Sequence, residues 1–176
     1  MTDYRRVYIP GATWFFTVNL AERRNNRLLI EKIDPLRAAF RYVKDRKPFH
    51  INAIVIMPDH LHCIWTLPQE DSDYSTRWNL LKGHFSRTII KGEKISESRT
   101  KRRERGLWQR RFWAHLLCDQ EDFNNHVDYI HWNPVKHNWV QQVADWPHSS
   151  FHRYVKMGIY SINWGHSGDF TIHANE

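Results

Sequence analysis

Residues 51–67 constrain the fold of this chain more than any other stretch, because they are typical of two strands joined by a tight turn. INAIVIM at 51–57 and HLHCIWTL at 60–67 are rich in β-branched and aromatic residues, which favour strands. Between them, Pro58 and Asp59 put proline at its preferred second position of a β-turn. The pattern predicts an antiparallel hairpin with two histidines at the start of its second strand.

The second strand of this hairpin is expected to have two unlike faces. Alternate residues of a strand point to opposite sides of the sheet, so His60 and His62 project together. The other side is apolar and carries Leu61, Cys63, Trp65 and Leu67. We expect that side to pack on the core and to leave both imidazoles on the opposite face.

The remaining hydrophobic patterns predict further elements before and after the hairpin. They indicate strands at 14–20 and 107–118, and helices at 35–44, about 75–91, 119–132 and 149–157. Asp34 and Asp119 are expected to cap two of the helices, and Pro134 to bar one from continuing. The order strand, helix, strand, strand, helix, strand predicts a ferredoxin-like α+β sandwich. Its antiparallel sheet should pack helices on one face and leave the other open.

Charge and composition favour a globular nucleic-acid-binding protein. Apolar residues make up 41% of the chain, which suits a packed core, so we predict a single domain over residues 1–176. A basic loop is expected at about 92–106 and a C-terminal tail from about 140. The formal net charge of +7 favours nucleic acid as the partner ahead of an anionic membrane.

Two absences in the sequence narrow the class of protein further. No apolar run approaches the roughly 18 residues of a membrane helix, and the amino terminus lacks a secretory signal. We therefore expect no membrane partner and a cytoplasmic location. The two cysteines, Cys63 and Cys118, form no CxxC pair, which argues against a disulfide scaffold or a zinc finger.

Two groups of residues could carry chemistry. His60 and His62 could supply two nitrogen ligands to one metal ion, although two histidines on a solvated strand face explain that motif equally well. Tyr129 and Asn133 lie four residues apart and share one helix face, with His126 on the same flank. A tyrosine can attack a phosphodiester when a divalent cation withdraws charge from the phosphate. An isolated tyrosine is more often a residue between core and solvent.

Several blocks together resemble one family. The sequences MPDHLHCIWTL, WQRRFW and HVDYIHWNPVKH, with YRR, PGATWFFTVNL, DYSTRW and DWPHSSFHRYV around them, resemble the REP-associated tyrosine transposases, relatives of the single-strand transposases of insertion sequences. The resemblance runs from Tyr4 to about Tyr160. HLH corresponds to the HUH element of that family, a histidine, a hydrophobic residue and a second histidine. HLH alone is weakly specific, but its combination with the YxxxN helix is strongly specific.

The resemblance implies a role for each of these residues. His60 and His62 would bind a divalent cation, Mg or Mn. Tyr129 would be the single catalytic nucleophile, forming a 5′-phosphotyrosine link to DNA and releasing a 3′-OH. Asn133 matches the position of an amide that serves as third metal ligand, with His126 as the reserve candidate. The implied activity is nicking and strand transfer on single-stranded DNA carrying REP palindromic hairpins.

Basic residues around a few aromatic ones are candidates for DNA binding, because phosphate contacts and stacking platforms together suit single strands. Trp108, Phe112 and Trp113 are the candidate platforms, and Arg77, Lys82 and Arg87 add charge to the helix at 75–91. The main candidates for phosphate contacts are Arg5, Arg6, Arg99, Lys101, Arg102, Arg103, Arg105, Arg110 and Arg111. A solvated charged loop beside core aromatics is the alternative for this segment.

Other functions remain open at this level. The fold would also suit a non-catalytic nucleic-acid-binding module, although such modules usually expose aromatics where this strand has histidines. An HUH replication-initiator-type nickase is a second alternative, but many of those enzymes carry two tyrosines. A histidine phosphodiesterase would need a second histidine motif, which is not evident. The chain could act as a monomer or a homodimer.

Overall fold

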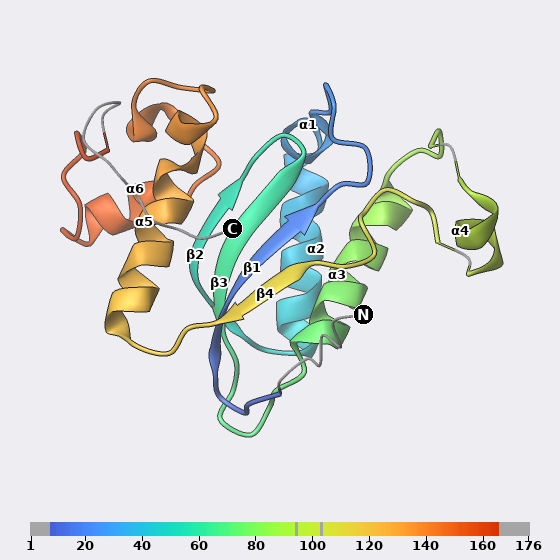
Figure 1. Ribbon diagram of the computed structural model, residues 1–176, viewed down its shortest axis with the longest axis horizontal. Helices are drawn as coiled ribbons and strands as arrows, with labels where there is room; N and C mark the ends of the chain where they lie inside the picture. The colour runs from blue at the N-terminus through green and yellow to red at the C-terminus, as the bar shows by residue number, and fades with distance from the viewer. Residues whose placement is uncertain (1–7, 94, 103, 166–176) are drawn as a thin grey trace, which may run out of the picture.

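The computed structural model describes residues 8–93, 95–102 and 104–165. It is built on a four-stranded antiparallel sheet with the order β2-β3-β1-β4 (Figure 1). The strands are β1 (Thr13–Asn19), β2 (His50–Ile56), β3 (His60–Thr66) and β4 (Trp113–Leu116). This order confirms the ferredoxin-like α+β fold and puts the histidine-bearing β3 in the centre of the sheet.

Helices lie on both faces of the sheet. The longer ones are α2 (Ile33–Arg46), α3 (Tyr74–Thr88) and α5 (Gln120–Lys136), and the short ones are α1 (Leu28–Glu31), α4 (Glu97–Lys101), η1 (Val143–Asp145) and α6 (Phe151–Lys156). Helices α2 and α3 contact each other on one face, whereas α5 contacts β2 and β3 on the other (Figure 1). The face expected to be open is therefore partly covered by α5. No helix among the described residues is long and apolar enough to cross a membrane.

The predicted two-faced character of β3 is confirmed. Leu61, Cys63, Trp65 and Leu67 belong to the larger hydrophobic core under α2 and α3. On the opposite face, Ile64 packs with Val127 and Ile130 of α5 in a second, smaller core. His60 and His62 share this second face, so the smaller core fixes the distance between the histidine pair and α5.

Several element boundaries differ from the expected ones. Asp34 lies in the first turn of α2 rather than at its cap, because the chain enters α2 directly from α1. Asp119 does cap α5 and accepts a hydrogen bond from the Asp122 backbone nitrogen at 2.8 Å. Pro134 lies inside α5, which continues to Lys136. Proline removes only one backbone hydrogen bond, and the buried side chains around it keep the last turn in place.

The region before α5 is less regular than expected. Only Trp113–Leu116 of the predicted strand at 107–118 forms β4, and the basic loop at 92–106 contains the short helix α4. Residues between them join the sheet through one isolated bridge, Leu20 to Trp108. Arginines at 110 and 111 interrupt the alternation that a half-buried strand needs.

Candidate active site

A cavity of about 330 Å³ lies between the second sheet face and α5. Side chains from β1, β3, β4, α5, the residue that caps the end of α5 and the loop after β1 line it: Phe15, Thr17, Asn19, Arg23, His60, His62, Trp113, His126, Tyr129 and His137. Three of the predicted catalytic and metal-binding residues, His60, His62 and Tyr129, are therefore brought together. His126, the reserve metal ligand, lines the same cavity.

His60 is oriented by a carboxylate. Its Nδ1 lies 2.6 Å from Oδ1 of Asp59, and Arg23 Nε donates to Asp59 Oδ2, also at 2.6 Å. Burial raises the pKa of the Asp59 carboxyl, but the hydrogen bonds from His60 and Arg23 outweigh that effect and lower the pKa to about 2. An ionised Asp59 holds the ring proton on Nδ1, which leaves the Nε2 lone pair of His60 available for a cation.

His62 is held in the same way by a hydroxyl group. Its Nδ1 lies 2.9 Å from Thr17 Oγ1 on the neighbouring strand. Burial lowers the pKa of His62 well below its usual range, and His60 and His137 act in the same direction when they carry a proton. A neutral ring whose Nδ1 is hydrogen-bonded presents Nε2 as a ligand. The ring centres of His60 and His62 are 5.0 Å apart, so the two rings can share one ion.

Tyr129 reaches this pair from α5. Its ring centre lies 5.2 Å from that of His62, and its side chain is only 3% exposed. Lys136 Nζ donates to the Tyr129 hydroxyl at 3.4 Å and sits 4.7 Å from the ring centre. A cation at this distance stabilises a phenolate. The seven-residue spacing on a helix, two turns, explains why Lys136 lies on the same side as Tyr129.

Asn133 does not line the cavity, yet its environment fits a metal ligand. It is fully buried, and neither amide atom has a hydrogen-bond partner among the described residues. It lies one turn from Tyr129 and one turn from His137, both of which line the cavity. A buried amide without partners is costly, and an ion bound by its oxygen would remove the oxygen's share of that cost.

His137 is a cavity residue that the sequence patterns did not single out. Its ring centre lies 5.4 Å from that of His60. It follows Tyr129 by two helical turns, so the same spacing that linked Tyr129 to Asn133 could have found it. The left-handed Asn138, with φ of 56°, ends α5 directly after it.

The predicted DNA-binding residues fall into two groups. Lys101, Arg102 and Arg111 are exposed, as expected for phosphate contacts. The others with described positions have structural partners: Arg99 donates to the Trp108 carbonyl at 3.1 Å, Arg110 pairs with Glu104 at 2.7 Å, and Arg105 pairs with Glu93 at 2.6 Å. Arg5, Arg6 and Arg103 lie outside the described residues.

Two residues that were expected to contribute to DNA binding are buried in the structure. Trp108 is 6% exposed and packs against Phe85 in the larger core, so it offers no stacking platform. Trp113, at 39% exposure beside the cavity, is the accessible aromatic instead. Arg77 is fully buried, where it bonds Asp71 and the backbone carbonyls of Lys47, Pro48 and Asp73. Neither reversal could be predicted from spacing, because burial depends on which elements pack together.

A second hollow of about 440 Å³ lies between α3 and the segment 99–110. Basic side chains dominate its lining: Lys82, Arg87, Arg99, Arg102, Arg105 and Arg110, against one carboxylate, that of Glu104, among the described lining residues. The chain from Trp108 to Trp113 runs from this basic hollow to the cavity that contains Tyr129.

Comparisons with known proteins agree with one another. A family model described as "Transposase IS200 like" matches residues 14–133. The chain is 49% identical over 171 residues to the REP-associated tyrosine transposase of Escherichia coli (strain K12), covering 97% of this chain and 94% of that protein. It is 44% identical over 173 residues to a putative REP-associated tyrosine transposase of Haemophilus influenzae, covering 98% of both. A solved REP-associated tyrosine transposase bound to a REP hairpin is 46% identical, with a TM-score of 0.81, and covers 100% of this chain and 99% of that chain.

Proposed function

Because this chain belongs to the REP-associated tyrosine transposases, within the IS200-like transposase family, we propose that it nicks and rejoins single-stranded DNA carrying a REP hairpin. The observation that carries the proposal is the convergence of Tyr129 with His60 and His62 in one cavity. The solved relative is bound to a REP hairpin, which supports the same type of DNA for this chain.

Tyr129 is the catalytic nucleophile in this proposal. Its hydroxyl oxygen attacks the phosphorus of a phosphodiester, a bond forms between that oxygen and the phosphorus, and the bond to the 3′-oxygen breaks. The phenolic proton balances the released 3′-OH, and the DNA 5′-phosphate stays on the tyrosine. Because the link keeps the energy of the phosphodiester, a second 3′-OH can reverse the step and join two strands without ATP. Lys136 stabilises the phenolate on which this attack depends.

Nε2 of His60, Nε2 of His62 and the amide oxygen of Asn133 form the proposed metal site. The family's divalent cation, Mg or Mn, when bound there would withdraw charge from the phosphate. His60 and His62 are pre-oriented by Asp59 and Thr17, and the amide oxygen suits a hard cation. Asn133 is preferred over His126 because both of its amide atoms are buried without a hydrogen-bond partner among the described residues, whereas His126 already has a partner in Asp122.

The hairpin would be held by the basic hollow between α3 and the segment 99–110. Lys82, Arg87 and Arg102 line it, and phosphate neutralisation by lysine and arginine supplies most of the affinity for DNA. Exposed Trp113 lines the same cavity as Tyr129 and could stack on a base of the single strand. In this arrangement the basic hollow would hold the hairpin, and the single strand next to the hairpin would enter the catalytic cavity.

The test is a covalent adduct. A single-stranded oligonucleotide with a REP-like hairpin, labelled at its 3′ end, is incubated with the protein and Mg or Mn. The expected result is labelled protein that withstands SDS, while the same strand labelled at its 5′ end gives a free, shorter fragment ending in 3′-OH.

Tyr129→Phe should abolish the adduct and leave hairpin binding intact. Tyr42→Phe, which removes a tyrosine hydroxyl from α2 on the other side of the sheet, is the matched control and should react as the unchanged protein does. An adduct that persists in Tyr129→Phe, or hairpin binding without cleavage in any divalent cation, would overturn the proposal. The second result would identify a binding module.

A further inference from the structure

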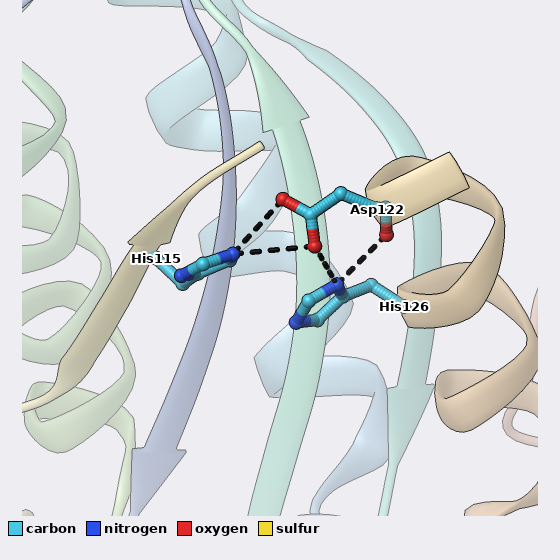
Figure 2. Close-up of side chains that lie close together, drawn as sticks. All are labelled: His115, Asp122 and His126. Atoms are coloured by element: carbon cyan, nitrogen blue, oxygen red, sulfur yellow. Dashed lines mark hydrogen bonds and ion pairs between the residues drawn. The ribbon is translucent and has the colours of Figure 1, made fainter. Parts of the chain in front are cut away.

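A second group of metal-ligating side chains lies where β4 meets the start of α5. Figure 2 shows that Asp122 points between the rings of His115 and His126. Asp122 Oδ2 lies 3.0 Å from His115 Nε2, and Asp122 Oδ1 lies 3.0 Å from His126 Nδ1. One ligand atom from each of the three residues lies within 4.8 Å of the other two, and all three residues are partly buried.

Local structure explains why these residues converge. Asp122 and His126 are one turn apart on α5 and share a face. His115 pairs with Phe15 across the β1–β4 ladder, and its side chain meets that helix face. The Cys118 backbone nitrogen donates to Asp122 Oδ2 at 3.2 Å, which fixes the carboxylate between the two rings. The start of α5, the register of β4 on β1 and the turn at Cys118 together bring the three side chains close to one another.

The same contacts would also be found in an ion-pair network without a metal. The types of ligand atom and their spacing are therefore compared with those of known metal sites. Two imidazole nitrogens and one carboxylate oxygen are a typical three-residue set for zinc, which keeps a fourth position for water. Bonds of about 2.0–2.1 Å to a tetrahedral ion put ligand atoms roughly 3.4 Å apart. The 3.0 Å separations in this cluster are close to that value.

The surroundings resemble the outer layer of a metal site. The Trp113 ring stacks on His115 with 5.5 Å between centres and 7° between planes. The Phe15 ring lies 4.6 Å from that of His126. Aromatic packing limits how far either imidazole can turn, and it would act together with the hydrogen bonds that orient ligands in metal centres.

We propose that His115, Asp122 and His126 bind a transition-metal ion of the zinc class at a site separate from His60 and His62. Binding takes the lone pair of His126 Nδ1, so the proton that Nδ1 now donates to the Asp122 carbonyl at 2.8 Å moves to Nε2. The ion joins the edge strand β4 to the first turns of α5. It thereby fixes the helix that carries Tyr129.

The experiment measures zinc binding by the full chain, with zinc alone as the probe. A His60→Ala/His62→Ala double variant removes the first proposed site, and calorimetric titration is expected to find one zinc per chain. Adding His115→Ala to that variant should remove the remaining equivalent, and adding Asp122→Asn should weaken it at least about tenfold. Adding His50→Ala, which removes an exposed histidine of β2, should leave it unchanged.

Thermal unfolding provides a second readout. Zinc should raise the Tm of the double variant and leave the Tm of the variant with the added His115→Ala unchanged, with circular dichroism verifying that each variant is folded. Failure of the double variant to bind zinc would overturn the proposal. The proposal would also be overturned if adding His115→Ala or Asp122→Asn to the double variant changed neither the stoichiometry nor the affinity of zinc binding.

Discussion

Nδ1 of His60 lies 2.6 Å from Oδ1 of the preceding residue, Asp59. The contact joins the turn of the hairpin to the first proposed metal ligand, so the Pro-Asp turn both shapes β3 and orients its histidine. Because Asp59 touches His60 but is not itself a proposed ligand, its effect on the metal site can be tested with the ligands left in place.

Asp59→Asn should weaken the proposed metal site without unfolding the protein. An amide orients His60 less firmly than an ionised carboxylate, and losing such a partner costs roughly 10–100-fold in metal affinity. The Mn concentration that gives half-maximal nicking should rise by that factor, and saturating Mn should restore the rate. Arg23→Gln, which leaves the contact between Asp59 and His60 in place, is the control and should shift the curve less. Identical curves for Asp59→Asn and the unchanged protein would contradict this role.

Lys136→Met should slow formation of the tyrosine adduct. The Lys136 ammonium donates to the Tyr129 hydroxyl, and a hydrogen bond to a charged group contributes about 1.5–3 kcal/mol. The single-turnover rate should therefore fall by roughly 10- to 100-fold, with hairpin affinity changed far less. Lys156→Met on α6 is the control. An unchanged adduct rate would mean that Lys136 does not assist the nucleophile.

Arg102→Ala and Arg111→Ala should weaken DNA binding in a salt-dependent way. Both side chains are exposed, and each phosphate contact contributes about 0.7–0.9 to the slope of log affinity against log salt concentration. Each substitution should lower the magnitude of that slope by the amount expected for one lost phosphate contact, about 0.7–0.9, and should leave the Tm unchanged.

Arg105→Ala should behave differently, because Arg105 pairs with Glu93 and with backbone carbonyls at the end of α3. We expect a lower Tm for this variant. If the Arg102→Ala and Arg111→Ala variants kept the same slope of log affinity against log salt concentration as the unchanged protein, these two side chains would not contact the DNA.

His131 should make stability depend on pH. Burial lowers its pKa to about 3, helped by the positive charges of Arg153 and His152, and its Nε2 bonds Ser150 Oγ at 2.9 Å. The folded pKa is below the unfolded value, so this contribution is complete above about pH 6.5 and is lost as the pH falls toward 3. The loss approaches 1.4 kcal/mol per pH unit.

Urea unfolding at about pH 7 and about pH 4.5 measures this effect. His131→Gln does not titrate, so its free energy of unfolding should fall less between the two pH values. His50→Gln, at an exposed position, is the control and should follow the unchanged protein. Parallel losses in His131→Gln and the unchanged protein would show that another group is responsible.

Local patterns in the sequence were sufficient to predict the main strands and helices and the faces on which their residues lie. Alternation along 60–67 determined that His60 and His62 share one face and that Leu61 and Trp65 face the core, because side chains in a strand alternate. Helical spacing likewise placed Tyr129 and Asn133 on one side of α5. The blocks around them identified the family.

Tertiary packing decided what those patterns could not. Helix α5 covers the second face of the sheet, Trp108 lies in the core, and His115 meets Asp122 and His126. Each of these depends on which residues far apart in the chain become neighbours. Periodicity reports only the side on which a residue lies within its own element. The sequence determined the two halves of the proposed nicking site, and only the packing of α5 against β3 decided that they meet.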